Sequence, residues 1–385
     1  MDSLFWTAAA LVIYVYAGYP LFLLFVRALA GARRTQLAAD HSPPITLIIS
    51  AYNEAEIIGE KIANSLSLGY PADRLEILVV SDCSSDGTDE IVTAVKDPRV
   101  RLLRMAERGG KTLGLNAAVT AARGEILVFS DANAMYVHDA LATLARNFAD
   151  PGVGAVVGES TYSQDSQAQA GADKDESLYW RYEVMIKRLE SALGSTVGGD
   201  GAIYAIRKSL YRPMRADALS DFVNPLQIVQ AGFRCIYEPQ ARSIENAAGD
   251  FEREFRRKVR IVNRAWRAMM TLKDLLNPLR YGLFSLQIFS HKLLRWLVPV
   301  FLVVCLIANV AIAGRHWFYA AALGIQLAFY GLAAIGHLLR RRRSVPRIFA
   351  VPYYFVMVNI ASARGIAEAY RGKTYTTWTT ARASN

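Results

Sequence analysis

Four long apolar stretches bracket one polar region in this chain. The first covers residues 4–26, and the other three cover 297–314, 317–336 and 348–363. An α-helix needs roughly 20 apolar residues to cross a bilayer. The pattern therefore predicts membrane helices towards both ends of the sequence and one sizeable polar domain between them.

The first and last apolar stretches each allow two interpretations. Residues 4–26 lack the basic start of a cleaved signal peptide and exceed its usual apolar core, which favours a retained anchor. Residues 348–363 are interrupted by Pro352 and Asn359 and are barely long enough to span. This last segment either crosses the membrane or lies in its interface.

Arginines flank the apolar stretches. Arg27, Arg33 and Arg34 follow the first stretch, and five arginines lie between positions 340 and 347. The positive-inside rule places such flanks, and with them the polar domain, on the cytoplasmic side of a multi-pass inner (plasma) membrane protein. The net charge of +10 comes from basic residues beside apolar segments, so the expected partner is the lipid bilayer and not nucleic acid.

Alternating apolar runs and helical patterns fill the polar region. Strands are expected at residues 45–50, 75–80, 100–104 and 125–129, and helices at 55–68, 90–96 and 111–122. This order predicts an α/β fold with a mostly parallel sheet, in which ligands gather at the carboxyl ends of the strands.

Three polar clusters, at residues 52–54, 82–86 and 131–133, stand at such strand ends. Converging carboxylates suit a divalent cation that bridges a pyrophosphate. Each cluster could also cap a helix. The sequence has no GxxxxGK[ST] loop, and the widely separated Cys83, Cys235 and Cys305 offer neither a disulfide framework nor zinc-ligand spacing.

The order of these motifs over roughly residues 43–270 resembles glycosyltransferase family 2. The segments that carry the resemblance are Ile49-Ser50-Ala51-Tyr52-Asn53-Glu54, Val80-Ser81-Asp82-Cys83-Ser84-Ser85-Asp86-Gly87-Thr88, Gly109-Gly110-Lys111 and Ser130-Asp131-Ala132-Asn133. The similarity is to the membrane branch that makes cellulose, chitin, hyaluronan and poly-N-acetylglucosamine. It implies a GT-A fold, a Mg²⁺ or Mn²⁺ cofactor and inverting transfer from a nucleotide sugar, usually a UDP-sugar.

The resemblance also implies roles for the donor-site residues. Ala51, Tyr52 and Glu54 would line the base and ribose pocket, and Asp82 would hold the uracil or ribose. Lys111 would approach the diphosphate, where a mobile point charge can follow the leaving group. The alternative for Lys111 is an ordinary solvated helix start.

Asp131 and Asn133 occupy the positions of the family's DxD metal motif. An amide replaces the second carboxylate, so Asp131 should provide most of the metal binding, and the affinity should be weaker.

The residues expected at the acceptor site lie in motifs later in the sequence. Gly201 and Ala202, in a glycine-rich turn, would line the acceptor site. Asp221, preceded by Ser220 where the family has an acid, would be the base that accepts the acceptor's hydroxyl proton. Its alternative role is to cap a helix entered at Phe222.

Residues 251–276 form an amphipathic, arginine-rich pattern suited to a membrane surface. By resemblance to the QxxRW motif of processive members, Arg260 or Arg264 would contact the diphosphate and Trp266 would stack on the acceptor. The glutamine is absent and one extra residue separates Arg264 from Trp266. Interface anchoring would explain the same residues, which leaves processivity open.

The resulting plan divides the chain into an anchor (1–30), a GT-A domain (42–248), interface helices (249–296), a membrane region (297–368) and a tail (369–385). The leading function is sugar transfer to a growing β-linked polysaccharide, with a partner subunit or an oligomer completing any conduit. The alternative is transfer of one sugar to a lipid-linked acceptor. A transporter with a nucleotide-sensing domain and an inactive binding homologue are weaker alternatives.

Overall fold

The computed structural model describes residues 1–33, 35–162, 173–245, 251–340 and 345–377. The chain divides into two compact units. The membrane unit comprises Met1–Gly31, Gln164–Leu189 and Ala247–Lys373, and the sheet unit comprises Ala32–Ser163, Glu190–Asn246 and Thr374–Asn385. Arg34 and residues 341–343 of the predicted basic flanks lie outside the described residues.

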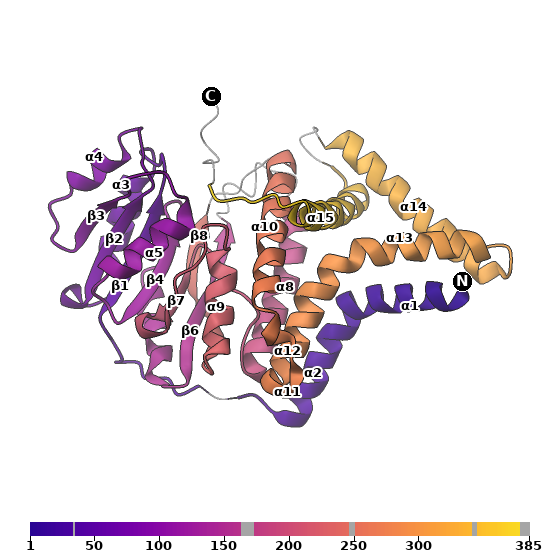
Figure 1. Ribbon diagram of the computed structural model, residues 1–385, viewed down its shortest axis with the longest axis horizontal. Helices are drawn as coiled ribbons and strands as arrows, with labels where there is room; N and C mark the ends of the chain where they lie inside the picture. Colours follow the sequence, from indigo (N-terminus) through magenta and orange to yellow (C-terminus); the bar gives the residue numbers. More distant parts are fainter. Residues whose placement is uncertain (34, 163–172, 246–250, 341–344, 378–385) are drawn as a thin grey trace. The chain divides into compact units, whose positions relative to one another are not determined.

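An eight-stranded mixed sheet forms the centre of the sheet unit (Figure 1). Its spatial order is β3-β2-β1-β4-β7-β6-β8-β5. The strands are β1 Ile45–Ala51, β2 Leu75–Ser81, β3 Val100–Arg104, β4 Ile126–Asp131, β5 Met135–Tyr136, β6 Val153–Tyr162, β7 Tyr204–Arg207 and β8 Arg234–Glu245. Strands β3, β2, β1 and β4 run parallel, whereas β7 is antiparallel to both of its neighbours. The predicted α/β class with a mostly parallel sheet is confirmed.

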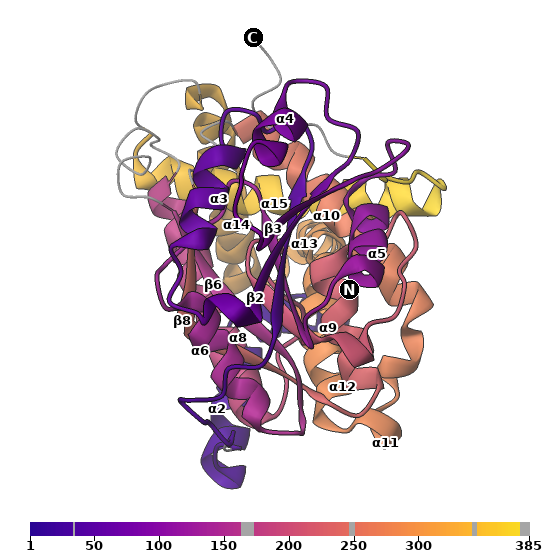
Figure 2. The same cartoon turned by 90° about the vertical axis from the view of Figure 1, so that its left-hand side faces the viewer.

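Short helices cover both faces of this sheet. They are α3 Ile58–Leu66, η2 Ala72–Arg74, α4 Thr88–Thr93, α5 Lys111–Ala121, α6 Ala140–Ala145, η3 Arg146–Ala149, η4 Lys208–Leu210 and α9 Ser220–Gln230. Figure 2 shows α3 and α5 on opposite faces of the strands. Both faces of β1 are therefore shielded from water, and Leu47, Ile48 and Ile49 have no exposed surface, as expected for a parallel strand between two helical layers.

The predicted elements recur with shifts of a few residues at their ends. The helix expected at 90–96 spans Thr88–Thr93, and the chain enters it through Gly87 in a left-handed conformation (φ 95°). The helix expected at 55–68 is shorter, Ile58–Leu66, since residues 55–57 form a turn. End positions are the least constrained by periodicity alone.

Helices build the membrane unit. In chain order they are α1 Asp2–Ile13, η1 Tyr14–Gly18, α2 Tyr19–Ala30, α8 Asp173–Leu193, α10 Phe251–Thr271, η5 Lys273–Leu276, α11 Pro278–Tyr281, α12 Leu283–Ile288, η6 Phe289–Leu294, α13 Arg295–Ile312, α14 Trp317–Leu339 and α15 Arg347–Tyr370. The last four residues of α8 belong to the sheet unit.

Three described helical stretches are long and apolar enough to cross a membrane: Asp2–Ala30, Leu283–Ile312 and Trp317–Leu339. They match the first three predicted apolar stretches, although the second helical stretch ends at Ile312, two residues before the end of the predicted stretch 297–314. The fourth, at 348–363, lies within the continuous helix α15, which is not one of these three. Its buried Gly365 packs against Val259 of the amphipathic helix α10.

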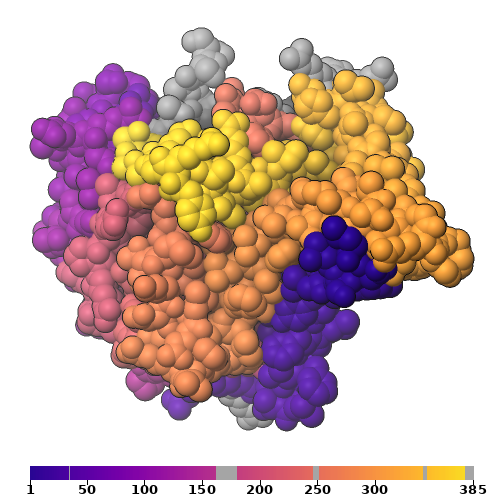
Figure 3. Space-filling model, turned by 45° about the vertical axis from the view of Figure 1, so that its right-hand side comes forward, coloured from indigo at the N-terminus to yellow at the C-terminus, as the bar shows by residue number. Residues whose placement is uncertain are grey.

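Helices α1 and α14 pack against each other through aromatic rings. Trp6 stacks on Phe318 with ring centroids 5.5 Å apart, and Figure 3 shows the N-terminal helix covered on one side by α13 and α14. Phe5 lies in a buried cluster with Ala308 and Ile312. Large rings that fit together in this way hold helices in register.

A buried charged cluster lies inside the membrane unit. The Glu183 carboxylate of α8 pairs with Arg295 and lies 3.2 Å from His291 Nε2. Nearby, the Tyr182 hydroxyl donates to the Val15 and Tyr16 carbonyls at 3.1 and 3.2 Å, within the π-helical turn η1. Such a turn leaves carbonyls without their usual helical partner, and a neighbouring hydroxyl satisfies them here.

Candidate active site

The carboxyl ends of three neighbouring parallel strands create the candidate site. Ala51 at the end of β1 is paired in register with Ser81 of β2, and Ser50 with Asp131 of β4. The polar clusters that follow these strands therefore emerge at one edge of the sheet, as expected for a parallel α/β arrangement.

Hydrogen bonds join the first two clusters to each other. Asn53 N–H donates to Ser84 Oγ at 3.1 Å, Ser85 N–H donates to Asn53 Oδ1 at 2.9 Å, and Glu54 N–H donates to Thr88 Oγ1 at 2.9 Å. Asn53 and Cys83 both adopt left-handed backbone conformations, with φ of 54° and 59°. Non-glycine residues rarely hold this conformation unless the surroundings enforce it.

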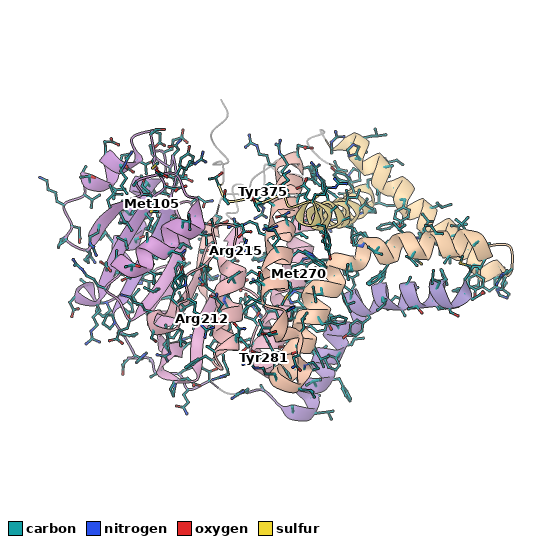
Figure 4. All side chains as sticks on the ribbon, in the orientation of Figure 1. Met105, Arg212, Arg215, Met270, Tyr281 and Tyr375 are labelled. Carbon is teal, nitrogen blue, oxygen red and sulfur yellow. The ribbon has the colours of Figure 1, made fainter. Side chains whose placement is uncertain are left out.

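Tyr52 carries a second planar group on its ring. The guanidinium carbon of Arg108 lies 3.8 Å from the centroid of the Tyr52 ring. Arg108 is exposed and belongs to the loop after β3, as does Met105, which is labelled in Figure 4. A stacked tyrosine and arginine suit the flat face of a nucleobase.

Asp82 holds the glycine turn that precedes α5. Asp82 is a buried residue, 2% exposed, and its carboxylate accepts from Gly109 N–H at 2.8 Å and from Gly110 N–H at 3.0 Å. Gly110 has φ of 84°, and a Cβ atom there would lie 2.1 Å from the Thr376 carbonyl oxygen. Only glycine fits this turn, because both the backbone conformation and the approach of the C-terminal segment exclude a side chain.

Four of the predicted residues meet around Lys111. Its Nζ pairs with the Asp131 carboxylate and lies 3.4 Å from the Gly201 carbonyl oxygen. A Cβ atom built on Gly201 would lie 3.5 Å from Asp221 Oδ2 and 3.7 Å from Lys111 Nζ. One small volume is thus bordered by a cation, two carboxylates and a glycine that leaves room beside them.

Asp221 occupies the first turn of α9, and the residue at the helix cap is Leu219, which makes no side-chain capping bond. The helix begins at Ser220, two residues before the Phe222 start assumed in the alternative that Asp221 only caps it. Burial, followed by the nearby Asp221 charge, raises the pKa of the Tyr204 hydroxyl well above its usual value. Asp221 therefore lies close to a buried aromatic wall formed by Tyr204 and Phe129, whose ring centroids are 4.7 Å apart.

The side-chain oxygen atoms of Asp131 and Asn133 are suitable ligands for a divalent cation that is bound together with a diphosphate. The Asp131 side chain is 37% exposed, and Asn133 is partly exposed. The described residues contain no group of three or more His, Cys, Asp or Glu side chains placed to hold a metal ion. Mg²⁺ and Mn²⁺ commonly take one or two protein oxygens and complete their shell with phosphate oxygens and water.

Arg260, Arg264 and Trp266 belong to α10 of the membrane unit, whereas all the other predicted site residues lie in the sheet unit. Trp266 is 8% exposed, with its ring centroid 6.2 Å from that of Trp296 and 6.0 Å from that of Tyr370. This packing favours a structural role for Trp266 within the membrane unit.

The turn at residues 198–202 carries both backbone and side-chain contacts. Ala202 is buried, and Asp200 Oδ1 accepts from Ala202 N–H at 3.2 Å, which is ordinary turn chemistry. Gly199 N–H donates to the Asp221 carbonyl oxygen at 2.6 Å. The turn and the start of α9 therefore form one connected wall of the site.

Sequence reasoning missed Arg108 and Lys61. Arg108 is a single cation in a polar loop, and nothing in its spacing marks it. Lys61 fell within a helical pattern, where a lysine normally indicates a solvated face, yet it is completely buried. The apolar residues on both sides of it, Ile58 and Ile62, were the only available signal.

Residues 46–212 match the family model described as Glycosyl transferase family 2. The chain is 36% identical over 96 residues to "Succinoglycan biosynthesis protein ExoO" of Rhizobium meliloti (strain 1021), covering 25% of this chain and 27% of that protein. It is 26% identical over 215 residues to "Poly-beta-1,6-N-acetyl-D-glucosamine synthase" of Staphylococcus aureus (strain COL), covering 54% and 51%. The aligned segments thus span about half, or less, of these curated relatives.

A further relative is "Beta-monoglucosyldiacylglycerol synthase" of Synechocystis sp. (strain ATCC 27184 / PCC 6803 / Kazusa), 33% identical over 118 residues, covering 30% of this chain and 25% of that one. Among solved structures, "Mannosyltransferase PcManGT from Pyrobaculum calidifontis in complex with GDP-Man and Mn2+" superposes with a TM-score of 0.71 at 24% identity, covering 96% of this chain and 99% of the other. The GT-A fold is confirmed, and residues 46–212 form a glycosyltransferase family 2 domain.

Proposed function

We propose that this protein is an inverting glycosyltransferase that moves a sugar from a nucleoside diphosphate sugar to an acceptor at a membrane surface. The observation that carries the proposal is the convergence of Lys111, Asp131 and Asp221 around Gly201. Lys111 suits the diphosphate directly and Asp131 suits it through a bound metal ion, while the Asp221 carboxylate borders the same volume. Transfer with inversion requires this separation of leaving-group and base functions.

Asp221 acts as the base in this scheme. Its carboxylate accepts the proton of the acceptor hydroxyl while the acceptor oxygen forms a bond to C1 of the sugar. The bond between C1 and the phosphate oxygen breaks on the opposite face, and its electron pair leaves with the nucleoside diphosphate. Lys111 follows the negative charge that develops there, because its long flexible stem lets the ammonium move with the phosphate.

A divalent cation, Mg²⁺ or Mn²⁺, would be held by Asp131 and Asn133 and would neutralise the leaving diphosphate. The mannosyltransferase of similar fold was solved with GDP-Man and Mn²⁺, which supports a metal-dependent nucleotide-sugar reaction. For the donor we favour a UDP-sugar held against Tyr52 and Arg108, with a GDP-sugar as the second choice.

The preferred acceptor is a growing β-linked polysaccharide. The alignment with the poly-β-1,6-N-acetyl-D-glucosamine synthase extends over 215 residues and supports this choice. The second candidate is a single transfer to a lipid-linked acceptor. It is supported by the relative that makes a glucosyldiacylglycerol and by the presence of only three candidate spans in the described residues, few for a polysaccharide conduit without a partner or an oligomer.

We also propose that the sheet unit faces the cytoplasm of a plasma (inner) membrane. Arg27 and Arg33 after the first span and Arg340 and Arg347 around the last loop support this orientation. Reporter fusions after Gly31 and after Gly314 should report cytoplasmic and external positions, respectively. The reverse pattern would rule out the proposed orientation.

The decisive experiment is turnover by the purified protein in lipid, with a panel of UDP-sugars and GDP-mannose in the presence of Mg²⁺ or Mn²⁺. Asp221→Asn should lower kcat by a factor of about 10²–10⁴ because the general base is lost. Asp217→Asn, the same substitution four residues earlier, serves as a matched control and should retain activity. If Asp221→Asn turns over within about threefold of the wild type, the assignment of the base is wrong.

Product length separates the two acceptors. A long, Asp221-dependent polymer identifies a polysaccharide synthase, and a lipid carrying one added sugar identifies the single-transfer enzyme. No metal-dependent nucleotide release with any donor would exclude both.

A further inference from the structure

Lys61 is a fully buried lysine directly behind the proposed metal-binding loop. It lies on α3 with no exposed surface, and its Nζ donates to the Ala134 carbonyl oxygen. The same ammonium lies 4.0 Å from the centroid of the Tyr136 ring. Among the described residues, Lys61 makes no ion pair with a carboxylate.

The next turn of α3 contacts the same segment through Asn64. Its Nδ2 donates to the Tyr136 carbonyl oxygen at 2.9 Å, and its Oδ1 accepts from Tyr136 N–H at 2.8 Å. One amide side chain thus satisfies both backbone groups of Tyr136, as a neighbouring strand would. Lys61 and Asn64 together fix residues 134–136 against α3.

The segment fixed in this way begins immediately after Asp131 and Asn133. Ala134 N–H donates back to the Asp131 carbonyl oxygen at 3.3 Å, which closes the loop. At the other end of the segment, the Tyr136 hydroxyl lies 3.2 Å from the Phe129 carbonyl oxygen and 3.0 Å from that of Ala202. The metal-binding loop is therefore tied both to its own strand and to the acceptor-side turn.

Burying an ammonium without a carboxylate partner is costly. Burial is also the main reason that the pKa of Lys61 is lowered, to about 7, although Asp131 and Glu245 favour the charged form. An apolar side chain of similar length would fill the same space without this cost. Stability of the α3 packing therefore gives no reason for a lysine at this position, whereas the carbonyl that it holds does.

We propose that Lys61 is a positioning residue for the metal-binding loop: by holding the Ala134 carbonyl, with Asn64 holding Tyr136, it fixes Asp131 and Asn133 in the geometry that binds the cation. This inference rests on the proposed function, because it assumes that these two side chains bind a metal. Groups that orient metal ligands from behind typically change metal affinity by about 10–100-fold when they are removed.

The test is Mn²⁺ binding by the full-length protein in detergent, measured from the loss of the free Mn²⁺ electron paramagnetic resonance signal. It is carried out with excess UDP and repeated with GDP, so turnover is not needed. The variants are Lys61→Met and Asn64→Ala, with Glu60→Gln on the exposed side of α3 as the matched control and Asp131→Asn as the variant that loses the ligand.

Lys61→Met and Asn64→Ala should each raise the Mn²⁺ dissociation constant by about tenfold or more, while Glu60→Gln leaves it unchanged. Unchanged affinity in both variants would mean that α3 only packs, and the proposal would be wrong. Tighter Mn²⁺ binding in Lys61→Met would show that the ammonium acts by repelling the cation, which also overturns the proposal. If Lys61→Met does not fold, Asn64→Ala decides, since it keeps the charge.

Failure of the proposed function gives a different result. If the wild-type protein binds no Mn²⁺ with either nucleotide, Asp131→Asn has no binding to remove. That result would refute the metal site itself. A wild type that binds Mn²⁺ alongside insensitive Lys61 and Asn64 variants would refute only the positioning role.

Discussion

Lys61→Met should make the sheet unit more stable at neutral pH, although it weakens metal binding. The ordinary lysine pKa is 10.5, and that of Lys61 is about 7 in the folded protein. Each unit of this difference corresponds to about 1.4 kcal/mol, so at pH 7 the buried lysine lowers the free energy of unfolding by about 4 kcal/mol. Methionine has a stem of similar length and lacks the charge.

Part of this gain is lost at the Ala134 carbonyl, which no longer has its donor. An unsatisfied buried carbonyl costs about 1–3 kcal/mol. The net expectation for Lys61→Met at pH 7 is therefore an increase of about 1–3 kcal/mol in the free energy of unfolding, an order-of-magnitude figure from these two opposing terms.

The stability difference between the wild type and Lys61→Met should depend on pH. Between pH 7 and about 10.5 the unfolded chain binds the proton that the folded lysine releases, so wild-type stability rises with pH across this window. Near pH 10 the cost of the buried lysine falls to about 1 kcal/mol, and the advantage of Lys61→Met should vanish or reverse. Below pH 7 the advantage stays constant, because both states then bind the proton.

The assay is thermal unfolding in detergent, followed by tryptophan fluorescence at pH 6, 7, 8, 9 and 10. Glu60→Gln controls for a charge change on the exposed face of α3. If Lys61→Met is less stable than the wild type by more than about 1 kcal/mol at pH 6–7, the ammonium is stabilised where it lies, and the burial cost used here is wrong. A pH-independent difference would also refute the linkage.

Two further substitutions probe other parts of the structure. Gly110→Ala meets both a φ of 84° and the Thr376 carbonyl oxygen at 2.1 Å, whereas Gly232→Ala meets a φ of 90° in open space. Backbone strain should lower the free energy of unfolding of both variants by about 1 kcal/mol or more. Only Gly110→Ala should also raise the KM for the donor. Equal kinetic effects in the two variants would show that the turn is not part of the donor site. Glu183→Gln leaves Arg295 and His291 buried beside an uncharged amide and should lower the free energy of unfolding by about 3–5 kcal/mol, measured by denaturation in detergent. Asp97→Asn, in a partly exposed pair with Arg99, should change this free energy far less, and a similar loss in both variants would contradict the buried-pair argument.

The sequence by itself determined the alternation of strands and helices, the three described helical stretches that are long and apolar enough to cross a membrane, and the residues at the ends of β1, β2 and β4. These follow from local pattern, because a short apolar run rich in β-branched residues, set between two helical patterns, favours a buried strand of a parallel sheet. It also indicated Asp131 and Asp221 through motif order. Their proximity to Lys111, by contrast, depends on the crossing of β4, α5 and α9 in space.

Only the tertiary structure decided which polar groups lost water and which partners they gained. Asp82 remains a predicted nucleoside contact, and the structure adds that its carboxylate accepts from the backbone N–H groups of Gly109 and Gly110. Trp266 remains a predicted sugar contact, and the structure adds that its ring packs near those of Trp296 and Tyr370. Lys61 has the spacing of a surface residue on an amphipathic helix, and it is buried because β5 and its tyrosine fold over it. The burial of Lys61 depends on a segment distant in the sequence, so the neighbouring Ile58 and Ile62 are only a weak signal of it.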